Sequence, residues 1–190
     1  MNHDAIPCSF PWLRRGTFRR VWISFAEAHS SYCAAHWRNG VIAVWTGKVT
    51  VDALRRIDAF QGAIARTHPS YYFVSVNPTG LPFPDSKARG YAVELLKKRS
   101  HEALVAIAVL EGDGLFASAG RGVLSSIFTR SNAKDVVCQD LGEAARSLAP
   151  LVIPGATEAE ARLALEVVRT ESRKLRRAAQ GDYSTSTQMS

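Results

Sequence analysis

The sequence predicts an α/β domain, in which an N-terminal hairpin leads into a mixed, mostly parallel sheet with helices packed on it, followed by a C-terminal helix. Three observations predict this class. The dipeptide Asn39-Gly40 separates two strand-like runs, and from residue 50 to 151 short apolar runs alternate with segments of helical period. The chain has 190 residues, of which 46% are hydrophobic and 22% charged, as expected for one globular domain. Strands that alternate with helices pair in parallel through right-handed crossovers.

The hairpin is the first element. Residues 32–38 and 41–49 have strand-like composition, and Asn-Gly between such runs favours a tight turn because both residues tolerate positive φ. Thr50 then suits the N-cap of a helix, which keeps a helical spacing of apolar residues until His68-Pro69 ends it.

Strands and helices alternate through the rest of the domain. The apolar run 103–110 has no polar alternation, which is typical of a strand buried on both faces. The other expected strands are 71–76 and 136–139, and the other expected helices are 86–99, 115–129 and 141–151.

The ends of the chain differ in composition from the middle. Thr157 and Glu160 form a capping box after the Pro154-Gly155 linker, which predicts a last amphipathic helix. We therefore divide the chain into a basic, aromatic N-terminal arm (1–31), the α/β domain (32–153), a C-terminal amphipathic helix (154–180) and a disordered polar tail (181–190).

The most informative local feature is Asp85-Ser86, which follows Pro84 at the start of the helix 86–99. The first N–H groups of a helix have no internal partner and the helix dipole is positive there, so a phosphate on Ser86 would be well placed. Asp and Ser are also preferred N-cap residues, and the segment by itself favours this structural interpretation.

The order of elements and the place of Asp85-Ser86 together resemble the STAS domain, the SpoIIAA-like family of anti-sigma-factor antagonists. In that family the helix after the second strand-to-helix loop begins with Asp-Ser, and the Ser is phosphorylated. A short strand followed by a polar turn and a Glu-Ala-containing helix, as in residues 136–145, is a second point of likeness. The resemblance covers about residues 32–151.

The resemblance implies a non-enzymatic, bacterial regulatory module that binds a protein partner, either a kinase or an anti-sigma-like regulator. Ser86 would be the phosphoacceptor, and Pro84, Asp85, Lys87 and Arg89 would form the contact surface. Lys87 and Arg89 replace the small residues that follow Asp-Ser in the family. Two cations here would attract a phosphate on Ser86 or an acidic partner.

An alternative function belongs to another class: an apolar-ligand or nucleotide-binding protein that resembles SEC14-like domains in topology. It predicts an enclosed pocket beside the sheet.

Gly112, Gly114 and Ala117 have the spacing of a dinucleotide fingerprint after a buried strand, but Glu111 and Asp113 would repel a pyrophosphate. A turn that needs glycine at positive φ explains the same residues, and we favour it.

The sequence offers no signature of catalysis, a cofactor or a metal. Ser118 lies inside a predicted helix rather than at a strand-to-helix elbow. The five histidines, His3, His29, His36, His68 and His101, have no metal-ligand spacing. We therefore expect a protein that is not an enzyme.

Charge and cysteine content limit the expected partners and location. The net charge of +7 assists contact with any acidic surface but selects none, and we expect the aromatics of the arm to pack on the domain rather than to bind nucleic acid. Cys8, Cys33 and Cys138 are far apart, which indicates reduced thiols and a cytoplasmic location. No apolar run approaches the roughly twenty residues of a membrane span. The oligomeric state is left open.

Overall fold

The computed structural model describes residues 22–29, 31–131 and 135–186. Within these ranges six strands form one sheet in the order β1-β2-β3-β4-β5-β6. The strands are β1 (Ser24–His29), β2 (Tyr32–Trp37), β3 (Gly40–Trp45), β4 (Tyr71–Asn77), β5 (Ala103–Leu110) and β6 (Asp135–Cys138). The helices are α1 (Val51–Thr67), α2 (Ser86–Arg99), α3 (Gly114–Ser131), α4 (Leu141–Leu148) and α5 (Glu158–Ser186), with a 3-10 turn η1 (Ala149–Leu151) after α4.

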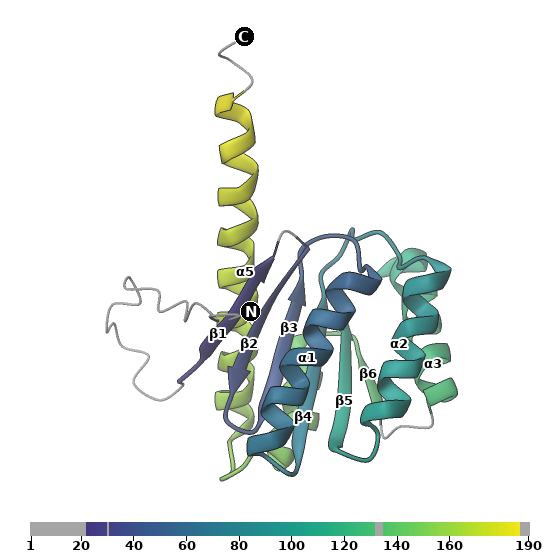
Figure 1. Ribbon diagram of the computed structural model, residues 1–190, viewed down its shortest axis with the longest axis vertical. Coiled ribbons are helices and arrows are strands. Elements are labelled where there is room, and N and C mark those ends of the chain that lie inside the picture. Colours follow the sequence, from purple (N-terminus) through teal and green to yellow (C-terminus); the bar gives the residue numbers. More distant parts are fainter. Residues whose placement is uncertain (1–21, 30, 132–134, 187–190) are drawn as a thin grey trace, which may run out of the picture.

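The sheet changes direction once along its width. β1, β2 and β3 pair antiparallel, whereas β3, β4, β5 and β6 pair in parallel. The helices α1, α2 and α3 connect the parallel strands and cover one face, and α4 and α5 pack on the other (Figure 1). The α/β class and the mixed sheet that begins with an N-terminal hairpin are thus confirmed.

The two faces of the sheet bury side chains of different size. On β4, Tyr72, Val74 and Val76 belong to the large core beneath α4 and α5, while the intervening Phe73, Ser75 and Asn77 face α1, α2 and α3. Successive side chains of a strand point to opposite faces, so each face of the sheet receives every second residue. The face covered by α4 and α5 carries one continuous cluster of buried aliphatic and aromatic side chains.

The predicted helix starts are confirmed in their capping contacts. Thr50 Oγ1 accepts a hydrogen bond from Ala53 N at 3.2 Å at the start of α1. At the start of α5, Thr157 Oγ1 accepts from Glu160 N at 3.2 Å, and the Glu160 carboxylate accepts from Thr157 N at 3.0 Å. These bonds satisfy donors that the first turn of a helix leaves without a partner.

The predicted start of the α/β domain at Tyr32 is too late in the chain. Within the predicted arm, residues 24–29 form β1 at the edge of the sheet. Ile23 and Phe25 pack against the main core, and the Glu27 carboxylate accepts a hydrogen bond from Tyr32 Oη at 2.6 Å. These contacts attach the segment to the domain. Residues 1–21 of the arm lie outside the described residues.

The hairpin turn also differs from its prediction by one residue. The two turn residues are Arg38 and Asn39, with Arg38 at a φ of 52°, and Gly40 already belongs to β3. Gly40 is needed for packing rather than for the turn, since a Cβ there would lie 2.2 Å from ring carbons of Tyr72.

The C-terminal helix is longer than predicted. α5 continues to Ser186, so the expected disorder of 181–190 is wrong for 181–186, and residues 187–190 lie outside the described residues. Helix propagation adds one hydrogen bond for each residue fixed, so a polar segment attached to a formed helix can extend it. The end of α5 projects beyond the sheet (Figure 1).

Candidate functional site

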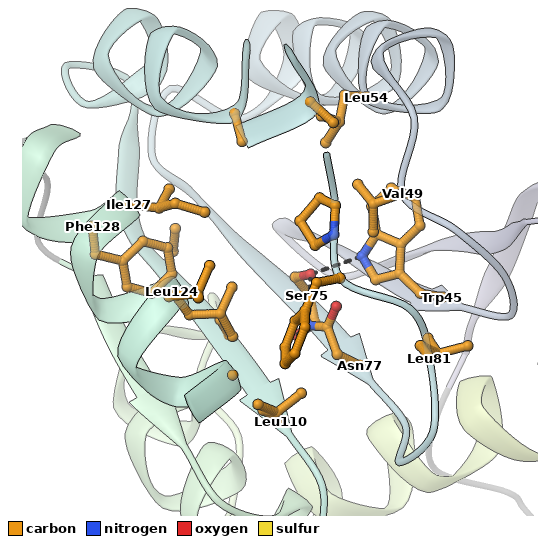
Figure 2. A pocket seen from close by; sticks show the side chains of 18 of the residues that line it. Trp45, Val49, Leu54, Ser75, Asn77, Leu81, Leu110, Leu124, Ile127 and Phe128 are labelled. Atoms are coloured by element: carbon orange, nitrogen blue, oxygen red, sulfur yellow. Dashed lines mark hydrogen bonds between the residues drawn. The ribbon is translucent and has the colours of Figure 1, made fainter. Parts of the chain in front are cut away.

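A cavity of about 160 Å³ lies between the sheet and the helices α1, α2 and α3 (Figure 2). Its walls come from β3, β4, β5, all three helices and the loop 78–84. The lining is mainly apolar, and one end of the cavity is formed by the loops that leave β4 and β5. The carboxyl ends of parallel strands are the usual location of ligand sites in open α/β sheets.

Small side chains on one face of the sheet explain why the cavity exists. Ala43, Ser75 and Ala108 are register partners across β3, β4 and β5, and Ala106 lies on the same face of β5. Valine and isoleucine occupy the intervening positions, which face the opposite core. The sheet is therefore well filled under α4 and α5, while Ser75, Ala106 and Ala108 leave space under α1, α2 and α3.

The sheet side of the cavity carries a short polar network. Trp45 donates from Nε1 to Ser75 Oγ at 3.0 Å (Figure 2). The amide nitrogen of Asn77 donates to the carbonyl of Val109 at 3.2 Å, to that of Ser75 at 3.3 Å and to Ser75 Oγ at 3.4 Å. All three contacts use the Asn77 nitrogen as a donor, so they fix which end of the amide is oxygen.

The charged groups that line the cavity belong largely to ion pairs. Arg99 donates to the Asp58 carboxylate at 2.5 and 2.7 Å and to Glu102 at 2.6 Å. Glu111 accepts two hydrogen bonds from Arg169, at 2.7 and 3.0 Å. Burial raises the pKa of the Asp58 carboxyl, but the hydrogen bonds from Lys98 and Arg99 outweigh this and hold its pKa below the usual value.

The segment Gly112-Asp113-Gly114 leads from β5 into the first residue of α3 at the end of the cavity. Gly112 and Gly114 have φ values of 106° and 86°, and a Cβ on Gly112 would lie 2.7 Å from Thr79 Oγ1. Thr79 Oγ1 itself donates to the carbonyl of Glu111 at 3.0 Å, which holds the two loops together. Positive φ thus accounts for both glycines, and the close approach of Thr79 is a second reason for glycine at position 112.

The predicted Asp85-Ser86 corner is a capped helix start. Asp85 is the N-cap of α2, where Oδ1 accepts from Ala88 N at 2.9 Å and Oδ2 lies 3.2 Å from Lys48 Nζ. The hydrogen bond from the Ala88 backbone, followed by that from Lys48, lowers the pKa of the Asp85 carboxyl. Ser86 is the first residue of the helix and is exposed.

The other predicted contact residues surround this helix start. Arg89 Nη1 donates to the carbonyl of Pro84 at 3.0 Å, and Lys87 is exposed. Pro84 is half-buried because it also lines the cavity. The loop 78–84 thus connects the two candidate sites: it forms part of the cavity wall and ends at the Asp85-Ser86 corner.

A pocket beside the sheet was predicted only for the alternative function, and no residue that lines it was predicted. Residue size could have indicated the cavity. Ala106 and Ala108 are alternate residues of one strand, and Ser75 lies on the same face of the neighbouring strand. The run 103–110 is uniformly apolar, and this uniformity hides the difference between its alanines and its larger residues.

Among the described residues, the serine, cysteine and histidine residues considered in the sequence lie outside the cavity lining. Ser118 lies within α3, as predicted, and is exposed there, and Cys33 and Cys138 are buried free thiols. His36 and His68 lie with their ring centroids 5.6 Å apart, a proximity that their spacing did not indicate. Within the described residues, no group of three or more His, Cys, Asp or Glu side chains is arranged to hold a metal ion. The helices in the described ranges are each too short or too polar to cross a membrane.

Comparison of the chain with models of known protein families, with curated proteins and with solved structures found no match.

Proposed function

We propose that this domain binds a small apolar ligand in the cavity between its sheet and α1, α2 and α3. The observation that carries the proposal is the cavity itself, which has a volume of about 160 Å³ and a mainly apolar lining. An apolar cavity of about 150 Å³ in another protein stays dry and binds benzene, so this volume suits a molecule of one aromatic ring or a short alkyl chain.

The energetics of the cavity support an occupant. An empty apolar cavity costs roughly 24 cal/mol per Å³ in lost packing, and a ligand that fills it recovers those contacts. Because Trp45 and Arg99 already have hydrogen-bond partners, an apolar ligand does not leave these lining groups without a partner on entry.

Ligand binding is tested by thermal denaturation of the full chain with benzene or toluene. A ligand at a hundred times its dissociation constant stabilises the folded state by about 2.7 kcal/mol, which raises the melting temperature. The matched control is Ala108→Leu, which places a larger side chain in the cavity from the buried strand β5. We expect stabilisation of the natural chain and none of the folded Ala108→Leu variant; equal shifts in both, or no shift with any probe, would contradict the proposal.

A second function, regulatory protein binding at the Asp85-Ser86 corner, is favoured by a different observation. Ser86 is exposed at the first turn of α2, next to the cations Lys87 and Arg89. The exposed Ser at this helix start supports the proposed likeness to the STAS domain, whereas Lys87 and Arg89 differ from the small residues found there in that family. In this function the protein is a non-enzymatic cytoplasmic module whose partner is a kinase or an anti-sigma-like regulator.

The second function is tested by mass spectrometry of Ser86 in protein from the native host and by partner capture with variants. Ser86→Asp is expected to change the set of captured proteins relative to Ser86→Ala. Ser118→Asp, on the exposed surface of α3, is the matched control and should capture the same proteins as the natural chain. An unmodified Ser86 together with identical capture by both Ser86 variants would refute this function.

A further inference from the structure

The side-chain oxygen of Asn77 is an unused acceptor at the cavity. The Asn77 nitrogen makes all the hydrogen bonds of this amide that the structure describes, to the Ser75 and Val109 carbonyls and to Ser75 Oγ. No donor among the described residues reaches Asn77 Oδ1. Among the described side chains, His36 Nε2 is the one nitrogen or oxygen that is fully buried and has no hydrogen-bond partner. Asn77 Oδ1 also has no partner among these residues, so it is not fully buried and a ligand can reach it.

Ser75 supplies the complementary group beside Asn77. Its Oγ accepts from Trp45 Nε1 at 3.0 Å and from the Asn77 nitrogen at 3.4 Å, and no described residue accepts its hydroxyl proton. Figure 2 shows Ser75 and Asn77 next to each other among apolar side chains. The cavity therefore presents one free donor and one free acceptor at the same place, which is the pattern that a hydroxyl group matches.

The charges around the cavity select against an ionised ligand. Arg99 is the one cation among the described lining residues, and it is paired with both Asp58 and Glu102. The acidic lining residues are Glu111, paired with Arg169, and the exposed Asp113. A carboxylate or phosphate would enter beside these acids without a free cation, and removing it from water would then be costly.

We propose that the ligand is an uncharged apolar molecule with one hydroxyl group, such as a phenol or a short-chain alcohol. The ligand hydroxyl donates to Asn77 Oδ1 and accepts from the Ser75 hydroxyl, while its apolar body occupies the space above Ser75 and Ala108. This inference rests on the proposed apolar-ligand function and adds the chemical class of the ligand and the two residues that recognise it.

The test compares four probes that differ in one group: phenol, toluene, anisole and benzoate. Toluene has nearly the shape of phenol but has no hydroxyl, anisole has an ether oxygen that accepts but does not donate, and benzoate is anionic. Binding to the full chain is measured by calorimetry and by the shift of the Trp45 indole N–H signal in nitrogen-proton correlation spectra. The Asn77→Leu variant removes the acceptor with little change of volume.

Phenol is expected to bind the natural chain more tightly than toluene, with anisole about tenfold weaker than phenol and benzoate not bound. In Asn77→Leu, phenol should weaken about tenfold or more while toluene retains its affinity, which also shows that the variant is folded with its cavity intact. Toluene binding without an advantage for phenol, or tightest binding of benzoate, would overturn the hydroxyl inference and leave the apolar-ligand function standing. A chain that binds none of the four probes contradicts both.

Discussion

Trp45 donates its indole N–H to the hydroxyl oxygen of Ser75 over 3.0 Å, and this bond joins β3 to β4 on the cavity side of the sheet. Trp45 is buried, with 2% of its surface exposed, so its N–H has little access to water. Removing the acceptor of a buried donor lowers the free energy of unfolding by more than the net contribution of the hydrogen bond, because the donor has also lost its hydration by water. The pair therefore contributes to the stability of the fold as well as shaping the cavity.

Ser75→Ala is expected to lower the free energy of unfolding by about 1–3 kcal/mol, because Trp45 Nε1 then has no acceptor. The measurement is urea denaturation followed by circular dichroism. In a double-mutant cycle with Trp45→Phe, the loss caused by Ser75→Ala should shrink by about 1 kcal/mol, since the donor is already absent. Strictly additive losses would mean that the two side chains do not stabilise each other.

Asn39 is the second polar group on which the fold depends. The residue is 2% exposed, and its side chain donates to the carbonyls of Ser70 at 3.1 Å and Leu151 at 3.2 Å and accepts from Ile153 N at 2.8 Å. One side chain thus ties the hairpin turn to the start of β4 and to the segment before α5.

Asn39→Ala should reduce the free energy of unfolding by about 2–4 kcal/mol, because it leaves three backbone groups without this partner. Chemical denaturation measures the loss. The control is Asn77→Ala, which removes an amide from the accessible cavity side of the sheet and should cost less. A loss below about 0.5 kcal/mol for Asn39→Ala would show that water or other groups replace the contacts.

Asn39 also shows how far the sequence predicts this fold. Asn39-Gly40 correctly indicated a hairpin, and Thr50 and the pair Thr157 and Glu160 correctly indicated helix starts, since these signals depend on neighbours in the chain. The role of Asn39 depends on Leu151 and Ile153, more than a hundred residues away. Such long-range contacts carry no local pattern in the sequence.

The candidate sites differ in the same way. The capped corner at Asp85 was predictable because Asp85 Oδ1 binds the backbone of Ala88, three residues along. The cavity depends on the register that places Ser75 beside Ala108, which only the assembled sheet defines. The edge strand β1 was missed because its short run of alternating residues gains stability from pairing with β2 rather than from its own propensity.

His36 predicts a pH dependence of stability. Burial lowers the pKa of the His36 imidazole, the nearby His68 acts in the same direction, and a backbone hydrogen bond at Arg38 opposes them. His36 Nε2 is buried, and no partner for it is found in the described part of the chain, so a proton there would be poorly accommodated. The unfolded chain, with a histidine pKa of about 6.5, then binds more protons than the folded chain.

The expected result is that stability is retained above about pH 6.5 and declines as the pH falls below this value. Urea midpoints at several pH values between about 5 and 8 measure the decline. His36→Gln should flatten this part of the profile, whereas His101→Gln, at an exposed position, should leave it in place. A His36→Gln profile that falls as steeply as that of the natural chain would assign the decline to other groups.

Ser86 allows the effect of a negative charge at the start of α2 to be separated from its effect on a partner. The first turn of α2 contains no acidic residue, and Ser86 is exposed there. Because the helix dipole is positive at this end, Ser86→Asp is expected to raise the free energy of unfolding by about 0.3–1 kcal/mol at low salt, and Ser86→Lys to lower it by a similar amount. Thermal denaturation at low and high salt measures the difference, which should shrink as salt screens the charges. If Ser86→Asp were less stable than Ser86→Lys, the proposed phosphate on Ser86 would be expected to disrupt α2. The predicted order would instead mean that a negative charge at residue 86 leaves α2 intact.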